Sequence, residues 1–91
     1  MKKANEIAII TKKAIEEKVA KRYDNTMALI NNTIAFAIEK NAKNGDYSLK
    51  IKVSECFDRD LIEKVLTEHG YDVKIKGYEV NIDWLKEYVK I

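Results

Sequence analysis

The sequence predicts an α+β domain of two layers, in which a long N-terminal helix and one short helix cover one face of a three-stranded sheet. Three observations lead to this fold class. Residues 5–43 contain no Gly or Pro and are rich in Ala, Ile, Glu and Lys. After residue 46, three stretches alternate apolar and polar residues, as strands do. A second helical pattern separates the first of these stretches from the other two. The length of 91 residues suits a single domain, residues 1–91, with the element order α-β-α-β-β and a short helical tail.

The first element is predicted to be one long helix that ends at Asn44-Gly45-Asp46. Its apolar residues recur at steps of three, four or seven, and Gly and Asn accept the left-handed conformation that ends helices. Two alternatives stay open at Asp24-Asn25-Thr26, where three poor helix formers follow one another. The helix either continues through these residues or folds back there.

The other elements are predicted from the spacing of apolar residues, from helix-capping residues and from turn residues. Residues 47–53 alternate as a strand with one polar face, and the short helix begins near Asp58 or Asp60 and ends before Gly70. Residues 71–76 and 78–84 flank Gly77 and should form a hairpin. We expect Asp83 to cap a last turn or two of helix.

The strand order is predicted from charge. The polar faces of the first and second strands carry lysines, whereas that of the third carries carboxylates and an amide. A central third strand places opposite charges side by side and agrees with the right-handed crossover rule. We therefore expect the order 1-3-2, with like charges kept apart. The residues are Lys50, Lys52, Lys74, Lys76, Glu79, Asn81 and Asp83.

The composition predicts neither an enzyme nor a metal or cofactor site. One Cys and one His lie thirteen residues apart, without the clustered ligands that metals need. We expect Cys56 to be a small buried residue and His69 to lie in the last turn of the short helix. A lone cysteine suits a reducing compartment, and no apolar run is long enough for a signal peptide or a membrane span. The expected location is the cytoplasm.

Two groups of residues suggest other contacts. Residues 1–22 carry a net charge of +4, so nucleic-acid binding is an alternative, although a solvated helix face explains these lysines better. The aromatic residues Tyr47, Tyr71, Tyr78, Trp84 and Tyr88 are expected in the core or at its rim. Candidate contacts to nucleic acid or a small anion are Lys12, Lys13, Lys18, Lys21, Arg22, Lys50, Lys52, Lys74 and Lys76.

The length of the first helix predicts self-association. An unbroken helix over residues 5–43 would be about 58 Å long, twice the diameter of about 30 Å expected for a compact domain of this size. Residues 1–26 should therefore protrude and oligomerise, most simply as a dimer. The candidate interface residues are Ile7, Ile10, Ile15, Val19, Leu29 and Phe36.

The order of these signals resembles short proteins of bacteriophages and prophages. The shared pattern is a long helix, a Gly-x-Tyr-Ser strand start, a helix that ends in Gly-Tyr, and a closing hairpin that ends in Ile-x-Trp. The residues that carry it are Gly45, Tyr47, Ser48, Gly70, Tyr71, Ile82 and Trp84. The resemblance implies a small protein that acts by binding, for example as an inhibitor of host defence in the host-cell cytoplasm.

The functional hypothesis is a non-enzymatic, oligomeric binding protein of phage type that antagonises a host defence system. Its partner would be a host or phage protein or a small anionic ligand. A nucleic-acid-associated accessory protein is the alternative. A third hypothesis, a sponge for a cyclic nucleotide, would use lysines of the sheet and a tyrosine.

Overall fold

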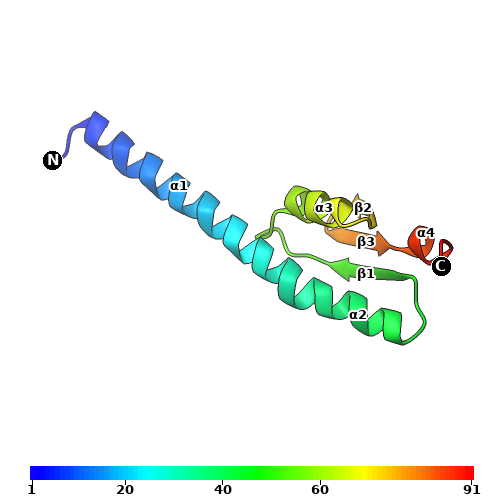
Figure 1. Cartoon of the computed structure of the whole chain (residues 1–91). Coiled ribbons are helices and arrows are strands. Elements are labelled where there is room, and N and C mark those ends of the chain that lie inside the picture. The colour runs from blue at the N-terminus through cyan, green and yellow to red at the C-terminus, as the bar shows by residue number, and fades with distance from the viewer.

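The computed structural model describes the whole chain, Met1 to Ile91. Its elements follow the predicted order and confirm the predicted fold class (Figure 1). They are α1 (Ala4–Ala28), a π-helical turn η1 (Leu29–Ile34), α2 (Ala35–Lys43), β1 (Ser48–Lys52), α3 (Arg59–Glu68), β2 (Asp72–Lys76), β3 (Glu79–Asp83) and α4 (Leu85–Tyr88).

The first three elements form one unbroken helix from Ala4 to Lys43. The alternative in which the chain folds back near Asp24-Asn25 is therefore wrong. Thr26 is fully buried, and its hydroxyl donates to the Arg22 carbonyl at 2.8 Å and accepts from the Asp58 N–H at 3.0 Å. Thr26 is of a type that commonly caps helices, but in this structure it links the long helix to the start of α3.

The π-helical turn lies where the long helix meets the sheet. The N–H of Ala35 reaches back to the carbonyl of Ile30, five residues earlier. Ile30 and Ile34 lie four residues apart on the same side of the helix, and both face the core, at 5% and 1% exposure.

The sheet has the order β1-β3-β2, as predicted, with β3 antiparallel to both neighbours. β1 and β2 are therefore parallel, and α3 lies in the crossover between them. The ladder continues past the strands, because Val53 N–H donates to Tyr78 O at 2.8 Å and Trp84 N–H donates to Tyr47 O at 2.9 Å.

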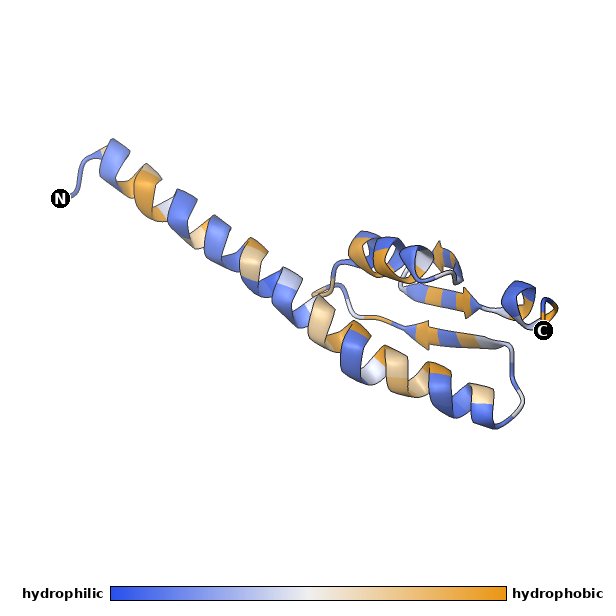
Figure 2. Cartoon of the chain, viewed as in Figure 1, coloured by the Kyte–Doolittle hydropathy of each residue, from blue (hydrophilic) through white to orange (hydrophobic).

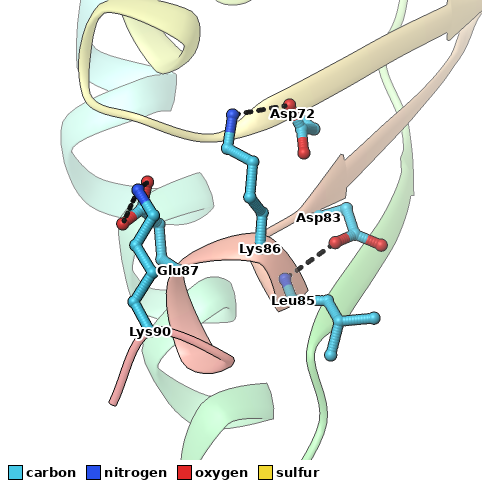
Figure 3. Close-up of polar contacts among 6 residues, drawn as sticks. All are labelled: Asp72, Asp83, Leu85, Lys86, Glu87 and Lys90. Atoms are coloured by element: carbon cyan, nitrogen blue, oxygen red, sulfur yellow. Dashed lines mark hydrogen bonds and ion pairs between the residues drawn. The ribbon is translucent and has the colours of Figure 1, made fainter.

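The expectation that like charges are kept apart is wrong at one row of the sheet. Asp72 lies directly opposite Asp83. Both carboxylates find other partners, which Figure 3 shows. Lys86 Nζ lies 3.7 Å from Asp72. Asp83 accepts the Leu85 N–H at 2.8 Å, although the N-cap position of α4 is held by the next residue, Trp84.

The core lies between the sheet and the helices on its one covered face. α2 packs over β1 and α3 over β2. The central position of β3 removes Val80 and Ile82 from solvent entirely. The buried apolar residues are Ile30, Ile34, Ile38, Val53, Ile62, Leu66, Val80 and Ile82.

Some expected core residues lie at the surface instead. Tyr71 and Trp84 pack on the core with ring centroids 6.2 Å apart, but Tyr47, Tyr78 and Tyr88 are exposed, because they lie outside the strands that the helices cover. The prediction of a buried Cys56 is also wrong. It lies in the exposed connection between β1 and α3, where its Sγ is 2.8 Å from Ser54 Oγ.

The molecule is elongated because α1 projects from the body (Figure 1). Its dimensions are 66 × 20 × 18 Å, and its radius of gyration of 17.9 Å compares with about 12 Å expected for a compact chain of this length. Every residue from Met1 to Asn25 is exposed.

Candidate interaction surface

The protruding part of α1 carries large apolar side chains in contact with solvent. Figure 2 shows apolar bands between polar ones along this helix, well away from the sheet. The exposed fractions range from 49% to 66%. The residues are Ile7, Ile9, Ile10, Ile15, Val19 and Tyr23.

These side chains do not form one stripe. At about 100° per residue, Ala4, Ala8, Ile15 and Val19 lie within about 60° of one another around the helix axis. We call these four residues the α1 seam. Ile7 and Ile10, which the sequence assigned to the same interface, lie about 90° and about 150° around the helix from the middle of the seam.

A shallow hollow lies on the seam. Its lining residues are Ala8, Thr11, Lys12, Ile15 and Glu16. The hollow exists because Ala8 and Thr11 are small beside Ile15, and the Thr11 hydroxyl is turned back to the Ile7 carbonyl at 3.1 Å. Ala8, Thr11 and Glu16 were missed in the sequence. The seven-residue step from Ala8 to Ile15 is the signal that could have found them.

The seam is covered at its C-terminal end by the body of the same chain. Arg22 and Thr26 follow Ile15 and Val19 by seven residues each, so they continue the same side of the helix. Arg22 Nη2 donates to the Phe57 carbonyl at 2.9 Å, and Thr26 bonds the Asp58 N–H. Free seam surface therefore ends near Lys21.

The other two interface candidates lie elsewhere. Leu29 is half-buried and packs against the core beside Phe57, so it is not a free docking residue. Phe36 is 68% exposed and lies on α2, at the level of the sheet. Only Ile15 and Val19 of the predicted set share the seam.

The basic residues of α1 are spread around the helix. Successive members of Lys12, Lys13, Lys18 and Lys21 differ in direction by roughly 60° to 140°, so they form no single patch. Arg22 already binds the Phe57 carbonyl. The structure therefore does not bring these five residues together as a phosphate-binding surface.

The lysines of the sheet lie on the face opposite α2 and α3, where α4 approaches one end. Asn81 separates Lys50 from Lys74 in one row, and Glu79 separates Lys52 from Lys76 in the next. Lys50 Nζ lies 3.5 Å from Glu79. The four lysines border the central strand instead of converging on one point.

A groove of about 580 Å³ opens between α2 and α3, with Trp84 and Tyr71 among its apolar lining. Its charged rim is already paired, since Glu39 lies 3.5 Å from Lys43 and Glu87 lies 3.2 Å from Lys90. His69 closes α3, where the sequence predicted it, and its Nδ1 is 2.8 Å from the Val65 carbonyl. The groove therefore offers an incoming ligand little unpaired charge.

The rings of Tyr47 and Tyr88 pack together, with centroids 4.8 Å apart. This contact holds α4 against the residue that precedes β1. The hydrogen bond with Tyr88, and then the charge that Tyr88 takes on when it ionises, raise the pKa of Tyr47 above its usual value. Tyr47 therefore stays protonated and uncharged around neutral pH.

No group of three or more His, Cys, Asp or Glu side chains lies close enough together to hold a metal ion. None of the helices combines the length and the apolar content that crossing a bilayer requires. Comparison with protein-family models, with curated proteins and with solved structures found no match to this chain.

Proposed function

We propose that this chain is a non-enzymatic binding protein that self-associates through α1. One observation carries the proposal: every residue before Arg22 is exposed, yet this part of the helix presents Ile15 and Val19 to water at 56% and 64% exposure. The setting that we propose follows from the resemblance to short phage proteins, which act by binding host or phage macromolecules.

The physical reason for association is that a helix standing alone in water lacks the tertiary packing that stabilises most helices in proteins. Most helical stability in proteins comes from packing an apolar face, and the body covers none of α1 before Arg22. A second helix along the seam would bury Ile15 and Val19 and exclude water from the backbone of both helices.

The experiment is light scattering behind size exclusion over a range of concentrations. The wild type is expected to approach twice the chain mass of 10.5 kDa as its concentration rises. Ile15→Glu should remain at the monomer mass, because it places a charge in the seam.

Ile9→Glu is the matched control, since Ile9 is 66% exposed and lies about 100° around the helix from the middle of the seam. It should associate like the wild type. A wild type that stays at 10.5 kDa throughout would disprove self-association.

A further inference from the structure

The hollow on α1 has the residue spacing of a helix-packing site. Ala8, Thr11, Lys12 and Ile15 stand at positions i, i+3, i+4 and i+7, which is the set of four that receives one side chain in coiled-coil packing. The seam residues change from small to large along the helix, with alanine at Ala4 and Ala8 and β-branched residues at Ile15 and Val19. Such a surface fits another helix whose small and large residues come in the opposite order.

A second copy of this chain provides that order when it runs antiparallel. Placing Ala8 opposite the partner's Ile15 also places Ala4 opposite the partner's Val19. Each layer then joins one small and one large side chain, and the two-fold symmetry repeats both layers. In a parallel pair, alanine would meet alanine and leave gaps at the N-terminal end.

The body of the chain also excludes the parallel arrangement. It occupies the seam side of the helix from Arg22 and Thr26 onward. Parallel helices paired through the seam would bring both bodies into the same space. In the antiparallel register, each N-terminus ends beside the partner's Arg22, where the free seam surface stops.

Charge supports the same direction. Lys12 and Glu16 lie on one flank of the seam, and an antiparallel two-fold pair brings like flanks together. Helical side chains lean toward the N-terminus of their own helix. Lys12 of one copy and Glu16 of the other therefore lean toward each other, twice in each dimer.

We infer that two copies pair antiparallel along the α1 seam, with Ala8 of each copy packed against the partner's Ile15 and with reciprocal Lys12–Glu16 ion pairs. This inference rests on the proposed self-association and specifies its geometry. The dimer holds the two α/β bodies at opposite ends, with both lysine-bearing sheet faces free, and so presents two identical surfaces to a partner.

Charge exchange tests the ion pairs. Lys12→Glu alone and Glu16→Lys alone should each weaken dimerisation about tenfold, because two attractive pairs become repulsive. An equimolar mixture of the two variants should recover the wild-type dissociation constant, since each repulsion becomes an attraction in the heterodimer. Circular dichroism of the diluted monomers checks that both variants stay helical. If Lys12→Glu and Glu16→Lys each associate as tightly as the wild type, the predicted Lys12–Glu16 ion pairs do not form.

Spin labels test whether the two α1 helices run antiparallel. The labelled variants also carry Cys56→Ser, so that each chain holds a single cysteine. Labels at Lys3→Cys, Lys13→Cys and Lys21→Cys should give the shortest label-to-label distance at position 13. The axial offsets in the antiparallel register are about 25, 5 and 28 Å at the three positions. Three equal distances would overturn the antiparallel arrangement while leaving self-association intact. A monomer at every concentration would instead disprove the proposed function itself.

Discussion

The Thr26 hydroxyl joins two segments of the chain that lie 32 residues apart. It both donates and accepts, so the carbonyl of Arg22 and the N–H of Asp58 are satisfied by one buried side chain. Asp58 in turn caps α3 by accepting from Leu61 N–H at 3.1 Å. The position of α3 against the long helix therefore depends on this small chain of hydrogen bonds.

Thr26→Val should lower the free energy of unfolding by about 1–3 kcal/mol, because valine keeps the shape but leaves the buried Asp58 N–H without an acceptor. Urea denaturation measures the change. Thr67→Val is the control, since Thr67 is exposed in α3, and its effect should stay within about 0.5 kcal/mol. Equal effects of the two variants would show that the buried hydrogen bond contributes nothing.

Residues whose role is local were the ones that the sequence could predict. The Asp58 cap, the Asp83 hydrogen bond at the start of α4 and His69 at a helix end depend on neighbours within four positions. Thr26 and Cys56 were misjudged because their environment is set by segments distant in the chain. The Asp72–Asp83 row shows the same limit, since its repulsion is relieved by Lys86 from the following helix.

At the scale of elements, β3 holds the fold together because it pairs with both other strands. Its inward residues meet Leu49 and Val73 at Ile82, and Ile51 and Ile75 at Val80. Its outward Asn81 lies between Lys50 and Lys74. Adjacent residues on one strand therefore have opposite tolerance for a negative charge.

Ile82→Glu should lower the free energy of unfolding by about 3–5 kcal/mol, because it buries a charge without a partner. The same substitution at Asn81 should raise it by about 0.2–1 kcal/mol for each lysine that it faces. Chemical denaturation of both variants measures the difference. Comparable losses at the two positions would show that the assigned strand phase is wrong.

Much of the element pattern followed from period and charge. The alternation of Leu49, Ile51, Val80 and Ile82 defined the inward face, and the lysines on the flanking strands identified the central strand. The π-helical turn was not predicted, because its residues Leu29–Ile34 have ordinary helical spacing and their types do not distinguish this turn from the α-helix on either side.

At the scale of the whole molecule, length predicted that α1 protrudes if it is unbroken, because a helix of this length exceeds any body that the remaining residues could build. The sequence left open whether the helix folds back near Asp24-Asn25, and the structure decides this. The docking surface on α1 could be predicted only in part. Ile15 and Val19 were recognised as apolar, but Ala8 and Thr11 contribute through the space that their small side chains leave beside Ile15, and the seven-residue step from Ala8 to Ile15 was the one sequence signal for it.

The antiparallel pairing makes a prediction about overall shape. One chain is 66 Å long, and two chains that overlap over some 20 helical residues, about 30 Å, should reach a maximum dimension of about 100 Å. A crossed pair that touches near the middle of α1 would be shorter and broader. Small-angle scattering from the dimer fraction measures this dimension directly. A value close to the length of a single chain would show that the bodies lie side by side, because only pairing in opposite directions along the seam moves them apart.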